Sequence, residues 1–295
     1  MEKINKINNY RNAETKKCKS LHIGSQLVMF IALLFIFIPL YVMIITSLTS
    51  DAESHNTQFH FIPQMGVTLD AYITAFTRRT GGPTLIQAFF NSMWIYIPGV
   101  LVGCFVSSFA AYAFAKLNFK VKKVAFAILI SGLTLPNCLG QIASFLLFDK
   151  LNWVNTALPL IVPKMLGSVS VVFFLRQFYM GIPDDLIGAG RVDGLNEFGI
   201  FFSIMLPISI PAVLSQFILQ FIVAYNDYLG PLLYLQNANL YPITIAISFF
   251  TEAYVQDWPL QMAGCTIAML PLLFLYLLSQ KFILAGVAIS SGLKG

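Results

Sequence analysis

Residues that commonly bind metals or act as bases are few and widely scattered in this sequence. The three histidines, His22, His55 and His60, do not form a ligand-spaced cluster within one helix. We therefore expect them in solvent or at interfaces. The four cysteines, predicted to be inert packing residues without a metal-like pair, are Cys18, Cys104, Cys138 and Cys265. No nucleophile stands out beside a base, so the sequence predicts neither a catalytic site nor a metal site, and indicates that the protein is not an enzyme.

Nucleotide-binding motifs are also missing from the sequence. No G-x-x-x-x-G-K-[ST] phosphate loop occurs, and the glycine and lysine of segment 286–294 have the wrong spacing for one. Gly188, Gly190 and Gly194 give the spacing G-x-G-x-x-x-G without a preceding strand, which does not fit a dinucleotide-binding loop. The chain is predicted to need no cofactor of its own.

Polar side chains inside apolar stretches are the next candidates, because such groups are costly in lipid and usually face a helix bundle or a wet path. Gln216, Gln220 and Asp227 recur at offsets of four and eleven, which places them on one helix face, and Asn137 and Gln141 share another. Asn226 lies beside Asp227. These residues either hydrogen-bond between helices, which is the commoner use, or line a path for a polar solute.

The segment from Gly181 to Pro207 has the signals of a helix, a turn and a second helix. Pro183 followed by Asp184 and Asp185 is typical of a first helical turn, where proline fits and acids face the positive end of the helix dipole. Asp193 and Gly194 are expected to form the turn between the two helices. Asn196 caps the second helix and Glu197 lies in its first turn. The expected apolar anchors of the second helix are Leu195, Phe198, Phe201 and Phe202.

The elements that position these residues are predicted from composition and hydropathy. The chain has 295 residues, of which 57% are hydrophobic and 11% charged, and its mean hydropathy is +0.75. A soluble domain carries about 25% charged residues, so we predict an all-α membrane protein. Six stretches are long enough to cross a bilayer: 26–46, 92–115, 124–148, 158–175, 201–224 and 262–282.

The net charge is +5, and most basic residues flank the apolar runs. This distribution indicates how the chain is oriented in the membrane and does not indicate nucleic-acid binding. Fourteen of the 18 lysines and arginines fall on one side: Lys3, Lys6, Arg11, Lys16, Lys17, Lys19, Lys116, Lys120, Lys122, Lys123, Arg176, Arg191, Lys281 and Lys294. The other side has Arg78, Arg79, Lys150 and Lys164. Both termini and the loop 181–203 are therefore predicted to be cytoplasmic.

The domain organisation follows from these assignments. Residues 1–20 are predicted to be a polar, mobile tail, residues 21–289 the membrane domain, and residues 290–295 a cytoplasmic tail. A short amphipathic helix is expected from Thr68 to Phe76 in the long outer segment. The apolar run 241–250 is too short to cross the bilayer and is expected in a folded outer loop or a re-entrant piece.

The loop resembles the EAA signature of ABC importer permeases. Asp193, Gly194 and the Leu206-Pro207 pair fall on that pattern, and Ala189 lies in its alanine segment. Gly188 stands where the family usually has glutamate, and Gly190 where it usually has alanine. The resemblance implies a type I importer fold and a loop that docks on an ATPase. Its coupling residues would be Asp184, Asp185, Leu186, Gly188, Ala189, Gly190, Asp193, Gly194, Asn196, Glu197, Leu206 and Pro207.

Other motifs, in order along the chain, resemble the second-permease branch of maltose-type importers: Phe90-Asn91-Ser92, Ala110-Ala111-Tyr112-Ala113-Phe114-Ala115, Trp153-Val154-Asn155-Thr156, Phe174-Leu175-Arg176-Gln177-Phe178, Asn226-Asp227-Tyr228-Leu229-Gly230-Pro231-Leu232 and Gly292-Leu293-Lys294-Gly295. This resemblance implies a bacterial inner-membrane permease for a sugar or oligosaccharide. The implied partners are a second permease, two ATPase subunits that bind the ATP, and an extracytoplasmic solute-binding protein.

The implied substrate path would use the polar residues already named, Asn137, Gln141, Gln216, Gln220, Asn226 and Asp227. A polyol-like solute such as a glycerol phosphodiester is an alternative cargo. An ion-driven secondary transporter is the alternative from a different class. It predicts carboxylates inside the spans, whereas Asp149 and Asp227 lie near span ends.

Overall fold

The computed structural model describes residues 2–54, 61–77, 82–134, 137–252 and 257–292, and these residues form helices joined by turns, with no strand among them. The predicted all-α class is confirmed. Contacts divide the chain into two units. The first comprises Met1–Tyr72 and Trp258–Thr266, and the second comprises Ile73–Asp257 and Ile267–Gly295.

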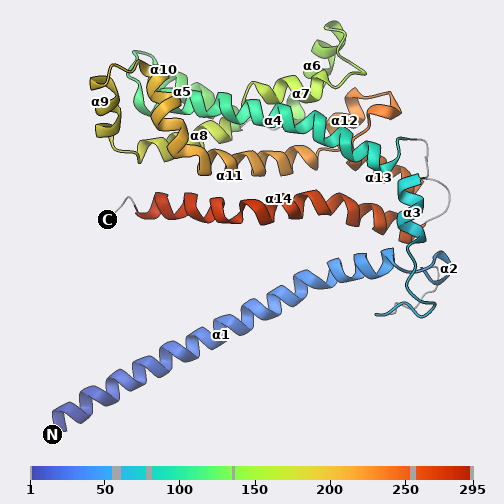
Figure 1. Ribbon diagram of the computed structural model, residues 1–295, viewed down its shortest axis with the longest axis horizontal. Coiled ribbons are helices and arrows are strands. Elements are labelled where there is room, and N and C mark those ends of the chain that lie inside the picture. Colours follow the sequence, from blue (N-terminus) through green and yellow to red (C-terminus); the bar gives the residue numbers. More distant parts are fainter. Residues whose placement is uncertain (1, 55–60, 78–81, 135–136, 253–256, 293–295) are drawn as a thin grey trace. The chain divides into compact units, whose positions relative to one another are not determined.

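The first unit contains α1 (Glu2–Ser47), α2 (Asp51–Ser54) and the beginnings of α3 (Asp70–Thr77) and α14 (Trp258–Gly292). Residues 2–20, predicted as a polar, mobile tail, are helical and continue directly into the apolar part of α1 (Figure 1). A charged sequence without an apolar period can extend a helix already formed by the adjacent span, because adding a residue costs far less than nucleation.

A buried acid connects α2 to the described residues that precede α3. Glu53 accepts hydrogen bonds from the backbone N–H groups of Gln64 and Met65, with heavy-atom distances of 2.7 and 3.2 Å. Ser47 and Tyr72 share a hydrogen bond of 2.7 Å between their hydroxyl oxygens. This bond connects the end of α1 to α3. The helix α3 confirms the predicted short amphipathic helix.

The second unit is built around α4 (Leu85–Lys116), which packs against α7 (Leu158–Met165), α8 (Val169–Met180) and α11 (Leu206–Tyr225) (Figure 1). Its close packing depends on small residues. A Cβ at Gly103 would lie only 2.0 Å from the backbone oxygen of Lys164. The helices therefore approach here at a distance that only glycine allows.

A buried hydroxyl network also joins three of these helices. The Tyr179 hydroxyl is 2.6 Å from Ser108 Oγ and 2.8 Å from Ser209 Oγ. Tyr179 belongs to α8, Ser108 to α4 and Ser209 to α11. All three side chains are buried, so the network satisfies polar groups that would otherwise be unpaired.

Five helical stretches of the described residues are long and apolar enough to cross a membrane. They are Ser25–Ser47, Leu85–Lys116, Leu158–Met180, Glu197–Tyr225 and Trp258–Leu278. The remaining predicted span, 124–148, is not one continuous helix but α5 (Lys122–Ser131), the 3-10 turn η1 (Gly132–Thr134) and α6 (Asn137–Lys150). Among the described residues, the 3-10 turn η1 interrupts the α-helical geometry after Ser131, and positions 135 and 136 lie outside the described part of the chain.

The segment of the second unit that follows α11 contains α12 (Leu229–Tyr234), the 3-10 turn η3 (Ala238–Leu240) and α13 (Ile243–Glu252). The apolar run predicted to be too short to cross forms α13, which packs on α4. Ser92 Oγ accepts a hydrogen bond of 2.9 Å from the Ile243 N–H.

Candidate functional site: a helix-turn-helix loop and a polar cavity

The loop that follows α8 forms two short helices, α9 (Asp184–Val192) and α10 (Glu197–Ile200). Asp184 and Asp185 occupy the first turn of α9, and Asn196 caps α10 by accepting a 2.8 Å hydrogen bond from the Gly199 N–H. Gly194, between the helices, has φ +81°. The predicted helix, turn and second helix are therefore confirmed, together with their local causes.

Charged and polar side chains hold this loop against the end of α4. The Lys116 ammonium donates to the Asp184 carboxylate at 2.5 Å and to the Ile182 carbonyl at 2.6 Å. Tyr112 donates a 2.8 Å hydrogen bond to Glu197. Hydrogen bonding from Lys116 lowers the pKa of the Asp184 carboxyl below its ordinary value.

Glu197 also joins the two loop helices to each other. It is bonded to Arg191 of α9, with 2.8 Å between the guanidinium nitrogen and the carboxylate oxygen. Because Tyr112 belongs to α4, the same carboxylate connects α9, α10 and the membrane helix. A displacement of the loop therefore acts directly on α4.

The two faces of α9 differ. Ile187 and Gly190 are buried, whereas Asp185, Leu186 and Ala189 are exposed. These three exposed residues are the ones expected to contact an ATPase.

The two glycines that depart from the family pattern have different surroundings. A Cβ at Gly190 would lie 2.7 Å from Ile204 Cδ1, so the glycine lets α9 approach η2 (Phe201–Met205) closely. A Cβ at Gly188 would have nothing within 4 Å. The departure at Gly190 thus has a packing cause, whereas position 188 has space for a larger side chain.

The predicted anchors of α10 behave unequally. Phe201 is fully buried, whereas Phe198 is 61% exposed and Phe202 is 51% exposed. Both exposed rings nevertheless contact α4. Phe198 stacks on Phe109 with 5.5 Å between ring centroids, and the Phe202 centroid lies 6.0 Å from that of Phe105. The π-helical turn η2 continues into α11 at Leu206 and Pro207. Because a π turn has more residues than an α-helical turn, it shifts side chains away from the helix faces that a regular α-helical pattern predicts.

A cavity of about 730 Å³ lies in the second unit, between α4, α6, α7, α11 and α12. Its polar lining consists of Gln141, Lys164, Ser168, Gln220, Asn226, Asp227, Tyr228 and Tyr234. Apolar lining from α4 includes Val100 and Cys104. The cavity therefore offers amide, hydroxyl and charged groups inside an apolar helix bundle.

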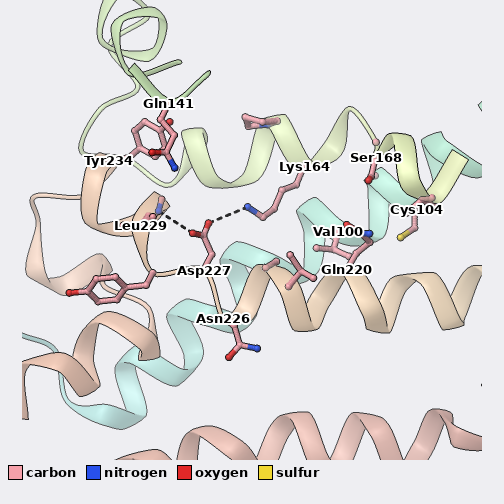
Figure 2. A pocket seen from close by; sticks show the side chains of 18 residues that line it. Val100, Cys104, Gln141, Lys164, Ser168, Gln220, Asn226, Asp227, Leu229 and Tyr234 are labelled. Atoms are coloured by element: carbon pink, nitrogen blue, oxygen red, sulfur yellow. Dashed lines mark hydrogen bonds and ion pairs between the residues drawn. The ribbon is translucent and has the colours of Figure 1, made fainter. Parts of the chain in front are cut away.

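An ion pair crosses this cavity. Lys164 of α7 points toward Asp227, which follows α11, and the distance from Nζ to Oδ2 is 3.7 Å (Figure 2). The other carboxylate oxygen of Asp227 accepts a 3.0 Å hydrogen bond from the Gly230 N–H at the start of α12. The Lys164 ammonium also lies 5.6 Å from the centroid of the Tyr96 ring, within the range of a cation–π contact.

The structure brings four of the six predicted path residues to this cavity: Gln141, Gln220, Asn226 and Asp227. Gln216 is buried outside the cavity lining, and the side chain of Asn137 lies outside the described residues. Gln220 also donates a 3.3 Å hydrogen bond to Ser170, so it has a contact between α11 and α8 besides facing the cavity.

Lys164 is the functional candidate that the sequence reasoning missed. It was assigned to the outer side by charge counting, but it lies in α7, within the apolar stretch Leu158–Met180. A lysine inside a predicted span was the available signal, since intramembrane cations usually have a partner and a function. The spacing of Gly99, Gly103 and Ser107 was likewise a signal for close helix packing.

Asn155 holds the end of α12, which contributes Tyr234 to the cavity lining. Its backbone N–H donates to the Tyr234 carbonyl at 2.7 Å, and its side-chain oxygen accepts from the N–H groups of Gln236 and Asn237 at 3.0 and 2.7 Å. Asn155 has φ +64°, a backbone region that asparagine enters more readily than most residues. The residue thus holds the end of α12 beside the turn that precedes α7.

Comparison with known protein families matches residues 99–289 to the "binding-protein-dependent transport system inner membrane component" family. The chain belongs to this family of ABC importer permeases. The permease is thus a multi-pass membrane protein that works with ATPase and solute-binding partners. The matched region includes both the helix-turn-helix loop and the polar cavity.

Individual relatives extend this assignment along the chain. The permease is 32% identical over 269 residues to the arabinooligosaccharides transport system permease protein AraQ of Halalkalibacterium halodurans, covering 90% of this chain and 94% of the relative. It is 30% identical over 199 residues to the lactose transport system permease protein LacG of Rhizobium radiobacter, covering 68% and 72%. A solved bacterial ABC transporter that imports the acidic polysaccharide alginate has a chain with TM-score 0.77 and 18% identity, covering 89% of this chain and 96% of that one. This last likeness shows that the fold is shared.

Proposed function

We propose that this permease forms the translocation path for a sugar or oligosaccharide. The observation that carries the proposal is the polar cavity among α4, α7, α11 and α12, because its amide, hydroxyl and tyrosine groups match a ligand rich in hydroxyls. The names of AraQ and LacG, which refer to arabinooligosaccharides and lactose, support the same class of cargo.

Coupling to ATP is proposed to act through α4. Tyr112 and Lys116 hold the cytoplasmic loop, while Val100 and Cys104 of the same helix line the cavity. Residues 100 and 112 are separated by about 18 Å along a helix that rises 1.5 Å per residue. A rigid α4 can therefore transmit a movement of α9 to the cavity wall, and nucleotide and a loaded binding protein would favour the outward-open state.

The proposed assembly contains this permease, a second permease, two ATPase subunits and an extracytoplasmic binding protein. The exposed face of α9, with Asp185, Leu186 and Ala189, docks on one ATPase. Both termini lie in the cytoplasm in this arrangement. The basic residues at Lys116, Lys122 and Arg176 support that orientation, since cytoplasmic loops carry an excess of lysine and arginine.

Reconstitution tests the proposed function. The complex is purified from its native membrane through a tagged permease, its partners are identified, and it is placed in proteoliposomes with its binding protein. We expect ATP-dependent uptake of at least one of arabinotriose, lactose and maltotriose, and no uptake when the partner ATPase is catalytically inactive. Absence of an ATPase from the purified complex, or uptake driven by an ion gradient without ATP, would contradict the proposal.

Cysteine labelling tests the orientation in a background without native cysteines. A cysteine at Asn196, between the two loop helices, should react only with membrane-permeant reagents in intact cells. A cysteine at Asn239, in η3, should react with impermeant reagents from outside. The opposite pattern would reverse the proposed topology.

A further inference from the structure

The ion pair in the cavity is not closed by a hydrogen bond. The 3.7 Å between Lys164 Nζ and Asp227 Oδ2 is longer than a hydrogen bond, so the two groups attract each other without being bonded. The Lys164 side chain is 28% exposed and the Asp227 side chain 29% exposed. Both groups line the cavity and keep hydrogen-bonding capacity for a ligand.

Asp227 is held in place for this role. Its Oδ1 is occupied by the Gly230 N–H, and its backbone carbonyl accepts a 3.1 Å hydrogen bond from Thr244 Oγ1. A Cβ at Gly230 would lie 2.6 Å from Oδ2, so glycine leaves space for the carboxylate to turn toward Lys164. The second carboxylate oxygen is thereby directed at the ammonium across the cavity (Figure 2).

The charges in the cavity balance. Among its lining residues, Lys164 supplies one positive and Asp227 one negative charge, and the other polar groups are amides and hydroxyls. Charged groups inside a membrane protein are costly unless they are paired or functional. An anionic ligand would be attracted by Lys164 and repelled by the neighbouring Asp227, so the cavity gives little net electrostatic advantage to either sign of charge.

We infer, building on the proposed function, that Lys164 and Asp227 together bind two neighbouring hydroxyl groups of a neutral saccharide. One hydroxyl accepts a hydrogen bond from the Lys164 ammonium, and its neighbour donates one to the free oxygen of Asp227. Each bond involves a charged partner and is stronger than a bond between neutral groups. Tyr228 and Tyr234 also line the cavity, and the Tyr234 ring is itself held by Phe145 and Phe148.

The test compares a transported saccharide with its monodeoxy analogues, each lacking one hydroxyl. The probes are arabinotriose, lactose or maltotriose, whichever is taken up, and those analogues of it that saturate the binding protein. Initial ATP-dependent uptake is measured in proteoliposomes for wild type, Lys164→Met and Asp227→Asn. Lys150→Met, at the end of the neighbouring helix α6 and outside the cavity lining, is the matched control.

We expect wild type and Lys150→Met to take up at least one deoxy analogue about tenfold more slowly than the parent sugar, since a hydrogen bond to a charged group corresponds to at least this factor. Lys164→Met should slow uptake of the parent sugar by a similar factor and show no further loss with the analogue that lacks its partner hydroxyl. Asp227→Asn should show the same for a different analogue. Because each ratio is taken within one variant, differences in the amount of assembled complex cancel.

Three results would overturn the inference. One is a ratio of parent to analogue that stays at the wild-type value in both variants, which would make the pair purely structural. Another is the absence of any discrimination by wild type. The third is faster wild-type uptake of the matching uronic acid saccharide, which would make Lys164 an anion site.

A replacement variant and one further outcome complete the test. If Lys164→Met does not assemble, Lys164→Arg takes its place, because arginine keeps the charge but donates from different positions. An altered ratio then supports the inference and an unaltered ratio contradicts it. Failure of wild type to take up any neutral saccharide would instead contradict the proposed function itself.

Discussion

Two ion pairs in the second unit illustrate two ways of building a functional region. Arg191 and Glu197 are six residues apart in the sequence, approach to 2.8 Å, and have side chains that are 55% and 41% exposed. Lys164 of α7 and Asp227, which follows α11, remain 3.7 Å apart and are more buried. The first pair belongs to a locally determined loop, and the second exists only because the helices pack around it.

The difference predicts how each region responds to substitution. The loop depends on short-range features such as the turn at Gly194, so changes there should alter coupling while the membrane helices stay folded. The cavity depends on the close approach of α4 to α7 and α8, so changes at Gly103 should disturb the fold itself.

Gly103→Ala is expected to have the largest effect. The added Cβ would lie 2.0 Å from the Lys164 backbone oxygen, so α4 and α7 must separate. Overpacking of this kind costs about 1–3 kcal/mol or more, and we expect a lower Tm and less monodisperse complex. Gly140→Ala in α6, where nothing lies within 4 Å, is the control and should be neutral or slightly stabilising. A wild-type Tm for Gly103→Ala would show that the packing can adapt.

Gly194→Val is expected to come next. Its Cβ would meet nothing within 4 Å, so the cost arises from the backbone at φ +81° and not from a clash. A β-branched residue in this region costs on the order of 1–2 kcal/mol, enough to change the angle between α9 and α10 and reduce uptake per ATP hydrolysed. Gly194→Asn should retain most uptake, because asparagine tolerates this conformation. Equal loss in both variants would point to a need for the glycine itself at the ATPase surface.

Asp185→Lys should have a moderate effect on coupling and little on folding. Asp185 is exposed in the first turn of α9, and a lysine there reverses the charge both at the helix N-terminus and at the proposed partner surface. We expect uptake per ATP to fall severalfold or the ATPase to dissociate more readily, with Tm nearly unchanged. Gly188→Glu, which places an acid in open space on the same helix, should be tolerated. Normal coupled uptake by Asp185→Lys would remove this residue from the interface.

The same contrast explains what could be predicted from the sequence. Pro183, Gly194 and Asn196 act on their immediate neighbours, and the loop they define agrees with the structure. Lys164 could not be placed opposite Asp227, because that contact depends on how α7 and α11 pack against α4.

Helix continuity and register also limited the prediction. The break between α5 and α6 and the π turn η2 interrupt patterns that hydropathy treats as continuous. Phe198 and Phe202, predicted to be anchors, contact α4 with their rings but remain largely exposed. Hydropathy therefore located the membrane segments more reliably than it located the faces of their helices.

Asp184→Asn should have the smallest effect, and its pH dependence identifies the cause. The Asp184 side chain is 85% exposed, so its bond to Lys116 is screened by solvent and contributes little. Lys116 lowers the pKa of this carboxyl in the folded state, so the contribution is complete above the unfolded-state pKa and disappears as the pH falls through the lower folded-state value. The Tm difference between wild type and variant should therefore be present at neutral pH and vanish in strong acid.

Salt and a neighbouring acid complete this test. High ionic strength should reduce the Tm difference at neutral pH, because exposed charges are screened. Asp185→Asn, a change at the adjacent first-turn acid, controls for the general effect of removing a negative charge from the N-terminus of α9. A difference that persists unchanged at low pH would show that the Asp184→Asn substitution disturbs the loop geometry. In that case the attachment of α9 to α4 would depend on the Lys116 bond to the Ile182 carbonyl more than on the ion pair.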